Sequence, residues 1–242
     1  MYNEGGGKTM PRTLLFIFIS ATLLSLSPAT IQAWRLEGDS IQPASVPTSW
    51  KADLPRTHAD LDGDGVDERL ELSNGQVSIL SSEETRWQSP DGWDIHQAMF
   101  GDLNHDGQIE AALLVWRRFK AWPVDQWLPS GGRIEDFHNT SGDSCHIILI
   151  GWGNGKFKEK WAGSSLAQPV LKMAEADLNM DGMDELVTLD STYDAGMNAP
   201  ADKLRVWEWN GFGFSLVSEK AGVFHNLEVM QVPNQKPILV TP

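Results

Sequence analysis

The sequence predicts an all-β fold made of repeated antiparallel sheets. Short apolar runs, such as AALLVW at residues 111–116, are separated by turn signals such as Gly153-Asn154-Gly155 and Asn210-Gly211. An acidic nine-residue motif occurs three times, each time between two such runs. The chain has 242 residues, of which 41% are apolar and 9% aromatic, so a domain of this kind can bury a substantial core.

The charge balance and the cysteine count exclude several classes of protein. The chain has 33 Asp and Glu against 19 Lys and Arg, a formal net charge of −14. A nucleic-acid partner is not expected, because neutralising phosphates requires a surplus of basic residues. The single cysteine, Cys145, rules out an internal disulfide and a cysteine-based zinc site. Acidity without these features points to bound cations.

The N-terminal segment has the pattern of a secretory signal. Residues 14–26 form a short apolar run that follows basic residues. A membrane-spanning helix needs about 20 apolar residues, so we expect a signal peptide over residues 1–33, cleaved after Ala33, and no membrane insertion beyond it. An uncleaved anchor stays open, because Ile31 is not the small residue preferred three positions before a cut. The protein is therefore expected to be secreted, periplasmic or displayed at the cell surface.

The acidic motif reads D-L-[DN]-x-D-G-x-x-E at residues 60–68, 102–110 and 177–185. Its oxygen-bearing side chains stand at positions 1, 3, 5 and 9, with glycine at position 6 for a sharp turn. This spacing can wrap one hard cation, and the backbone carbonyl at position 7 would add another oxygen. Calcium suits flexible sets of about six to eight oxygen ligands better than magnesium does, so we expect about three bound Ca²⁺ ions.

Plain turns and EF-hand loops fit the motif less well than this kind of cation site. Asp- and Gly-rich turns between strands would account for the glycines, but not for the oxygen side chains repeated at the same positions. An EF-hand loop needs a Glu at position 12 and flanking helices. Glu71 occupies that position in the first copy, whereas Leu113 and Thr188 occupy it in the second and third, and strand-like runs follow all three copies.

The motif followed by a β-run resembles the FG-GAP or VCBS-type repeat, which is found in the calcium-binding blades of integrin α-subunit propellers and in many secreted bacterial proteins. The resemblance covers residues 53–232 and is specific in the three motifs. This chain departs from the family in having Glu rather than the commoner Asp at position 9, and in having too few motifs for the usual blade number of about seven. The resemblance implies the following calcium ligands: Asp60, Asp62, Asp64, the Val66 carbonyl and Glu68; Asp102, Asn104, Asp106, the Gln108 carbonyl and Glu110; Asp177, Asn179, Asp181, the Met183 carbonyl and Glu185.

The strand pattern predicts a small β-propeller of about four blades over residues 34–242. Short extended segments precede the motifs at residues 54–59, 95–101 and 170–176, and further strands follow each motif. Tryptophans recur near the ends of the expected fourth strands, which indicates a packing role. These residues are Trp50, Trp87 and Trp161.

A fourth blade is expected to form from both ends of the chain. Residues 224–232 begin a fourth unit, residues 238–240 supply its second strand, and the sequence then stops. Residues 34–36 and 46–50 supply two unassigned strands at the other end. Joining them would close the ring and remove exposed sheet edges. An open stack of three blades and an oligomeric ring stay open, and the oligomeric state is not predicted.

Two long insertions are expected at the face opposite the calcium loops. They span residues 117–144 and 190–202, whereas the equivalent connection in the first repeat is only Asn74-Gly75. Because loops on a rigid scaffold commonly carry recognition, we expect a glycan or an extracellular protein to bind the larger insertion. The alternative is that its aromatic residues turn inward and anchor the loop. The candidate partner-binding residues are Trp122, Trp127, Arg117, Arg118 and Arg133.

Catalytic signals in the sequence are sparse. Ser144-Cys145-His146 suggests a nucleophile, but neighbouring residues of a strand face opposite sides, so Cys145 and His146 should not touch. The sequence therefore predicts a secreted, non-catalytic, calcium-binding module. The alternative is a propeller enzyme that acts on polysaccharide, a lyase or a hydrolase, because the fold hosts both kinds of function.

Overall fold

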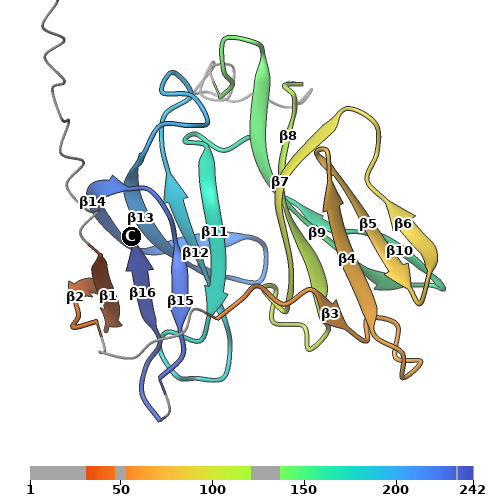
Figure 1. Ribbon diagram of the computed structural model, residues 1–242, viewed down its shortest axis with the longest axis horizontal. Coiled ribbons are helices and arrows are strands. Elements are labelled where there is room, and N and C mark those ends of the chain that lie inside the picture. Colours follow the sequence, from red (N-terminus) through yellow and green to blue (C-terminus); the bar gives the residue numbers. More distant parts are fainter. Residues whose placement is uncertain (1–30, 47–52, 121–136, 233, 242) are drawn as a thin grey trace, which may run out of the picture.

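In the part of the chain that the structure describes, sixteen strands form four antiparallel sheets of four strands each (Figure 1). The computed structural model describes residues 31–46, 53–120, 137–232 and 234–241. These residues contain no helix, so the predicted all-β class is confirmed. Accordingly, the described part has no helix long and apolar enough to cross a membrane. Residues 1–30 of the expected signal segment, together with Trp50, Trp122, Trp127 and Arg133, lie outside the described residues.

Three of the sheets follow the chain in order, and the fourth does not. The first sheet contains β3 (His58–Ala59), β4 (Glu68–Ser73), β5 (Gln76–Ser81) and β6 (Glu84–Gln88). The second contains β7 (Trp93–Gly101), β8 (Glu110–Arg118), β9 (Asp143–Gly153) and β10 (Lys156–Ala162). The third contains β11 (Val170–Ala176), β12 (Glu185–Asp190), β13 (Ala201–Trp209) and β14 (Phe214–Phe224). The fourth has the order β15 (Glu228–Met230), β16 (Ile238–Thr241), β1 (Gln32–Glu37), β2 (Ser40–Pro43).

Tight turns predicted from the sequence join neighbouring strands within the sheets. Asn74 and Gly75 have φ angles of 52° and 76°, and Asn154 and Gly155 have 56° and 78°. Positive φ at both central residues defines the two-residue turns whose twist matches that of paired strands. Asn and Gly tolerate this region of the backbone map, so these dipeptides set the register of β4 with β5 and of β9 with β10.

The second sheet is covered on both faces, and alternation along its strands sends neighbouring residues into two different cores. Leu113 packs in a cluster with residues of the first sheet, and Leu114 packs in a cluster with residues of the third. Trp87 in β6 and Trp161 in β10 are partly buried against these clusters, as predicted for the ends of fourth strands. A further cluster that includes Trp34 lies between the third and fourth sheets.

Both ends of the described chain contribute to the fourth sheet. β1 pairs antiparallel with β16, so that Ala33 lies opposite Val240. The indole N–H of Trp34 donates to Oγ1 of Thr241 (3.0 Å), across 207 positions of sequence. The prediction that the two termini complete one sheet is confirmed. A cut after Ala33 would fall inside β1 and remove its pairs at Gln32 and Ala33.

The second N-terminal strand lies elsewhere than predicted. The strand that pairs with β1 on this side is β2 at Ser40–Pro43, and residues 47–50 of the predicted strand 46–50 lie outside the described part. Gly38 has φ of 56°, which turns the chain back at once and pairs Glu37 with Ser40. Gly38, two residues after Leu36, therefore places the first turn of this sheet earlier than predicted.

Two first strands are shorter than predicted. The range 54–59 contracts to β3, because Pro55 has no N–H for a ladder and the carbonyl of Arg56 accepts the N–H of Phe100 in β7 (2.8 Å). The range 224–232 contracts to β15, because Phe224 ends β14 by pairing with Ala201. In both cases backbone groups expected in one sheet are used by another.

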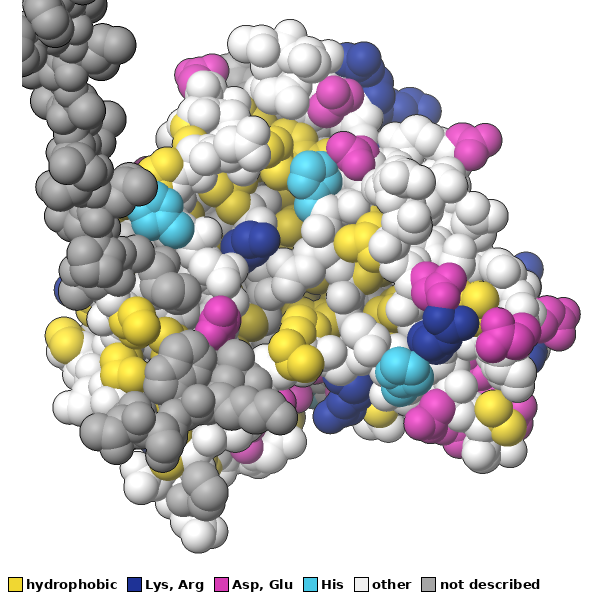
Figure 2. Space-filling view, viewed as in Figure 1, with side chains coloured by type: hydrophobic (Ala, Val, Ile, Leu, Met, Phe, Trp, Pro, Cys, Tyr) yellow, Lys and Arg dark blue, Asp and Glu magenta, His cyan; other side chains and the backbone are white. Residues whose placement is uncertain are grey.

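Neighbouring sheets pack in chain order, and the first strand of each of the later three sheets lies against the sheet before it. β7 contacts β4 and β5, β11 contacts β7, and β15 contacts β11. Figure 2 shows hydrophobic side chains near the middle of the face in view, whereas acidic and basic side chains are mixed over β4, β5 and β6. The edge strands β7, β11 and β15 lie toward the middle of the molecule in Figure 1, and the exposed residues 53–56 pass beside them.

We predict that Leu239→Ala lowers the free energy of unfolding by about 2–5 kcal/mol, because Leu239 is 0% exposed in β16. Leu216→Ala in β14 is the matched control, since Leu216 is 46% exposed and should change stability by no more than about 0.5 kcal/mol.

Deleting residues 236–242 removes β16 and should cause aggregation, because β1 and β15 lose their partner. Urea denaturation and size-exclusion chromatography measure these effects. A truncated chain as stable and monomeric as the full chain would show that the termini need not pair.

Candidate metal centre and loop face

Three acidic loops lie at the same end of the first three sheets (Figure 1). Acidic loop 1 (residues 60–68) joins β3 to β4, acidic loop 2 (102–110) joins β7 to β8, and acidic loop 3 (177–185) joins β11 to β12. In each loop, position 9 is the first residue of the second strand of its sheet. The corresponding connection of the fourth sheet, residues 231–237, contains no acidic residue. The motif therefore marks where three equivalent strands begin.

The acidic loops share one set of hydrogen bonds from backbone to side chain. The N–H of position 6 donates to Oδ2 of position 1 at 2.9–3.0 Å, and the N–H of position 7 donates to Oδ1 of position 5 at 2.8–2.9 Å. The N–H of position 5 donates to Oδ1 of position 3 at 2.8–3.1 Å. Asp and Asn are interchangeable at position 3, because this bond uses only an oxygen. The residues so arranged are Asp60, Asp62, Asp64, Asp102, Asn104, Asp106, Asp177, Asn179 and Asp181.

Left-handed backbone at positions 4 and 6 closes each loop. Position 6 is glycine in all three, with φ between 82° and 90°. Position 4 has φ of 78° at Gly63, but 54° at His105 and 67° at Met180, where a side chain makes this conformation cost about 1–2 kcal/mol. His105 Nε2 donates to the carbonyl of Asp184 (3.0 Å), which ties acidic loop 2 to acidic loop 3.

The glutamate at position 9 is buried in every loop, since Glu68, Glu110 and Glu185 are at most 3% exposed. Oε2 of Glu68 and of Glu185 accepts the N–H of position 2, at 2.8 and 2.7 Å. Oε1 of Glu68 and both carboxylate oxygens of Glu110 have no hydrogen-bond partner in the described part of the chain. Burial, with repulsion from Asp106 and Asp102, raises the pKa of Glu110 to about 7, and burial raises the pKa of Glu185 to about 7. A cation close to these carboxylates would offset the free-energy cost of burying their charge and the repulsion between them.

Two of the acidic loops gather carboxylates closely enough to hold a metal ion. In each, one oxygen from each of three side chains lies within 4.8 Å of the others. In acidic loop 3, by contrast, the amide nitrogen of Asn179 donates to Asp181 Oδ2 (3.0 Å) and Glu185 Oε1 (2.7 Å). The two clusters are Asp60, Asp62 and Asp64 in acidic loop 1, and Asp102, Asp106 and Glu110 in acidic loop 2.

Position 7 can offer only its backbone oxygen in two of the loops. Val66 and Met183 are 45% and 43% exposed and have no side-chain oxygen. The side-chain oxygen of Gln108 accepts a hydrogen bond from Lys160 Nζ (3.3 Å). Arg86 Nη2 lies 3.6 Å from Asp62 Oδ2. Basic residues of neighbouring strands therefore offset part of the charge of acidic loops 1 and 2.

The β8–β9 and β12–β13 connections lie at the opposite end of the sheets, which we call the loop face (Figure 1). The guanidinium of Arg117 lies 5.6 Å from the ring centroid of Trp93, and burial lowers its pKa. Arg118 donates to the Ser141 carbonyl and lies 3.6 Å from Asp143. The structure thus places two of the five predicted partner-binding residues at this face. A cavity of about 360 Å³ there is lined by Trp93, His96, Trp116, Arg117 and Met197, among others.

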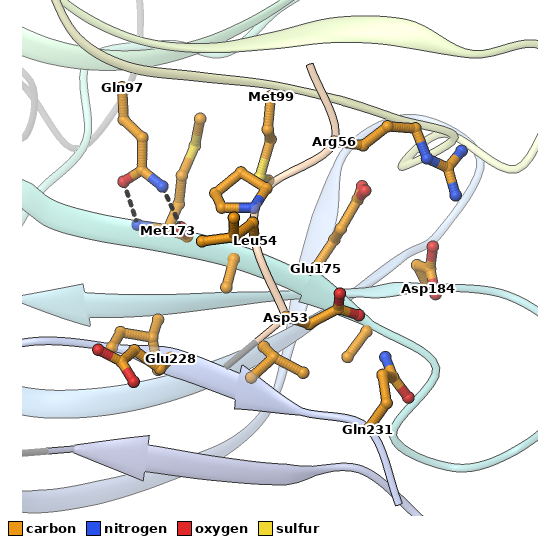
Figure 3. Close-up of a pocket in the computed structure, with 15 residues that line it drawn as sticks. Asp53, Leu54, Arg56, Gln97, Met99, Met173, Glu175, Asp184, Glu228 and Gln231 are labelled. Atoms are coloured by element: carbon orange, nitrogen blue, oxygen red, sulfur yellow. Dashed lines mark hydrogen bonds between the residues drawn. The ribbon is translucent and has the colours of Figure 1, made fainter. Parts of the chain in front are cut away.

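A cavity of about 510 Å³ lies where β7, β11 and β15 meet residues 53–56. Figure 3 shows Arg56, Glu175 and Asp184 on the same side of it. Gln97 bridges β7 and β11, since its Oε1 accepts the N–H of Met173 (3.0 Å) and its amide donates to the Met173 carbonyl (2.5 Å). Burial raises the pKa of Glu175 to about 8, and Arg56 acts against this rise. Polar contacts therefore join the sheets at this central cavity.

Ser144 and His146 form a pair that the sequence prediction missed. Ser144 Oγ lies 2.8 Å from His146 Nε2, and His146 Nδ1 lies 3.0 Å from the Gly163 carbonyl. Because a carbonyl only accepts, Nδ1 carries the proton and the serine hydroxyl donates to Nε2. The alternation that separates Cys145 from His146 also puts residues two apart on the same side of a strand, so the sequence already indicated that Ser144 and His146 lie together. Ser144 is 0% exposed and burial lowers the pKa of His146 to about 4, so the pair satisfies buried polar groups.

Comparison with known proteins reveals no relative. No protein-family model, no curated protein and no solved structure matches this chain. The function is therefore inferred from the loops and cavities themselves.

We predict that Cys145 does not react with thiol reagents in the folded protein. Its side chain is fully buried, Sγ lies 3.8 Å from the Val170 carbonyl, and burial raises the pKa of the thiol to about 12. At about pH 8 the thiol is therefore both protonated and shielded. A colorimetric thiol titration should detect the cysteine only after denaturant is added. Stoichiometric labelling of the folded chain would contradict its burial.

Proposed function

We propose that this chain is a calcium-binding β-propeller of four FG-GAP/VCBS-like blades that acts outside the cytoplasm as a non-catalytic binding module. The observation that carries the proposal is the repetition of one loop geometry, in which the same hydrogen bonds lead each time to a buried glutamate. The proposed partner is a glycan or an extracellular protein, held at the loop face.

A bound calcium ion accounts for the buried glutamate at position 9, which acidic turns alone do not require. Asp and Gly suffice for left-handed turns, but a buried glutamate with unpartnered oxygens destabilises a fold unless a cation is near. The oxygens at positions 1, 3, 5 and 9 and the position-7 carbonyl would hold the ion. When bound, Ca²⁺ supplies the positive charge that offsets the desolvation of these carboxylates. For Glu185 Oε1 to bind an ion in acidic loop 3, the amide nitrogen of Asn179 must stop donating its hydrogen bond to that oxygen.

The arrangement of the sheets supports the propeller. Each sheet has its first strand, β3, β7, β11 or β15, at one edge. Three of these strands and the residues that lead into β3 border the central cavity. The fourth sheet combines strands from both ends of the chain, which is the way a ring of four-stranded blades avoids a free edge.

A binding role is favoured over a polysaccharide lyase or hydrolase. The hydrogen-bonded pair of Ser144 and His146 is closed to solvent, so it offers no route for a substrate. At the loop face, in contrast, an exposed Arg118 lies near a cavity bordered by Trp93 and Trp116. Arg and Trp are the residues that most often dominate binding energy at interfaces.

We predict that calcium raises the melting temperature, and that Asp64→Ala, Asp106→Ala and Asp181→Ala each remove about one bound ion. Extracellular calcium sites commonly bind at about 10⁻⁴–10⁻³ M, and at about ten times Kd each site adds about 1.4 kcal/mol of stability. Atomic emission spectroscopy counts the ions, and thermal unfolding in calcium and in chelator measures the stability.

Asp91→Ala is the matched control for the metal sites. Asp91 is an exposed aspartate of the turn before β7 and belongs to none of the acidic loops, so its removal should leave the ion count and the calcium-induced shift unchanged. Identical melting of the wild type in calcium and in chelator would refute the stabilising role of the metal.

We predict that replacing both Trp122 and Trp127 with Ala abolishes partner binding and changes the free energy of unfolding by less than about 0.5 kcal/mol, because the proposal requires exposed indoles and exposed positions usually contribute no more than this. Arg117, Arg118 and Arg133 should support the same interaction. Glycan-array screening and pull-down from extracellular fractions measure binding. Asp194→Ala, an exposed change in the β12–β13 connection, controls for general effects on the loop face. A stability loss of several kcal/mol in the double variant would show that the indoles anchor the loop instead.

A further inference from the structure

A groove between the second and third sheets contains a cavity that neither the acidic loops nor the loop-face cavity accounts for. Its volume is about 350 Å³. Cavities that hold small ligands have volumes of roughly 300–1,000 Å³, so this one suits a compact molecule. Strands β9, β10, β12, β13 and β14 line it together with residues 163–168, which lead into β11. We call it the inter-sheet groove.

Aromatic side chains held in fixed positions form one wall of the inter-sheet groove. The indole N–H of Trp161 donates to the Phe212 carbonyl (2.9 Å), and the indole N–H of Trp207 donates to Oγ1 of Thr188 (2.8 Å). Trp161 meets Phe214 edge-on, with ring centroids 5.3 Å apart. Because these rings are already ordered, a ligand that packs on them does not bear the entropy cost of ordering them.

A buried carboxylate lies among the polar residues that line the groove. Asp190, at the end of β12, is 1% exposed, and its Oδ2 accepts a hydrogen bond from Arg205 Nη1 (2.6 Å). Its Oδ1 has no hydrogen-bond partner within the described residues. Burial raises the pKa of Asp190, while the Thr188 hydroxyl and Arg205 lower it. One unpartnered acceptor therefore lies in the wall of an otherwise largely apolar groove, and because this oxygen is buried, a donor reaches it only when the Asp190 side chain shifts toward the groove.

The charges around this carboxylate are already balanced. Arg205 pairs with Asp190, and its Nη2 also lies 3.1 Å from Glu219 Oε2. Lys203 Nζ lies 3.6 Å from the same Glu219 oxygen. The network thus joins a lysine and an arginine to an aspartate and a glutamate, so it carries no net charge. A charged ligand would leave this network unbalanced, whereas a neutral hydrogen-bond donor would not.

We propose that the inter-sheet groove binds a small, neutral aromatic molecule that carries one N–H or O–H donor. The ring lies against Trp161, Trp207 and Phe214, and the donor bonds to Oδ1 of Asp190. The inference goes beyond the proposed function, because it requires neither bound calcium nor the loop face.

The composition of the groove favours an aromatic ring over a sugar. Much of its lining is aliphatic, including Ile147, Leu166, Val170 and Leu186. A sugar ring carries several hydroxyl groups, and each hydroxyl buried against aliphatic side chains without a partner weakens binding. An indole or a phenol has one donor on an apolar ring, which matches one free acceptor in an apolar groove.

Two isomeric probes test the role of the donor on the full chain. 3-Methylindole and 1-methylindole have the same size, but only the first has an N–H group. Isothermal titration calorimetry should show 3-methylindole binding at least about tenfold more tightly, since a hydrogen bond to a charged group contributes about 1.5–3 kcal/mol. Methyl glucoside, the sugar probe, should not bind measurably.

A variant that fills the groove tests where the probe binds. Ala167 is exposed and borders the cavity, so Ala167→Trp should reduce 3-methylindole affinity at least about tenfold by occupying the space. Ala221→Trp is the matched control, because Ala221 is exposed on β14 and does not border the cavity. The control should bind 3-methylindole as the wild type does.

Three results would overturn the inference: equal affinity for the two isomers, binding of methyl glucoside but of neither indole, or unchanged affinity in a folded Ala167→Trp variant. The isomer comparison uses the unmodified chain, so it remains decisive even if that variant does not fold. The calcium-induced rise in melting temperature should be the same in Ala167→Trp and in the wild type. Failure of this inference is therefore distinguishable from failure of the calcium proposal.

Discussion

The pairing of β1 with β16 is the interaction on which the arrangement of the sheets depends. Without it, the fourth sheet would be two separate hairpins, β15–β16 and β1–β2, and an isolated hairpin is at best marginally stable in water. Trp34 reinforces the pairing, because its indole bonds to Thr241 and its ring meets Phe224 of the third sheet edge-on at 6.1 Å. One tryptophan therefore links the N-terminal strand to the C-terminal strand and to the neighbouring sheet.

The acidic loops connect the charge of the chain to the register of its sheets. A carboxylate at the start of β4, β8 and β12 is buried, and β8 and β12 continue from it into the apolar core. Whatever neutralises these carboxylates also stabilises the start of each strand. The fourth sheet has no acidic loop and relies on pairing between the termini instead. The sheets thus differ at this end: an acidic loop precedes the second strand in three of them, whereas the fourth depends on the pairing of strands distant in sequence.

Features that depend on local sequence were predictable, and features that depend on strand register were not. The spacing of the acidic motif, Gly at position 6 and the Asn-Gly turns act over a few residues, so their consequences can be derived from the sequence. β2 was missed although the turn at Gly38, which pairs Glu37 with Ser40, is also a local signal. The inter-sheet groove could not be anticipated, because Asp190 meets Arg205 only through the register in which Thr188 lies opposite Arg205 on β13.

Strand β12 connects the two kinds of site, because it begins at Glu185 in acidic loop 3 and ends at Asp190 in the inter-sheet groove. All six residues of β12 are buried, with Val187 and Leu189 in the core toward the fourth sheet and Leu186 toward the second. A strand packed on both faces moves as a unit, so a displacement of Glu185 would be transmitted to Asp190. If calcium bound at acidic loop 3 changes the affinity of the groove for its proposed ligand, that ligand must change the affinity for calcium by the same factor, since coupling between two binding sites is reciprocal. Equal groove affinity with and without calcium would mean that β12 already holds its bound position.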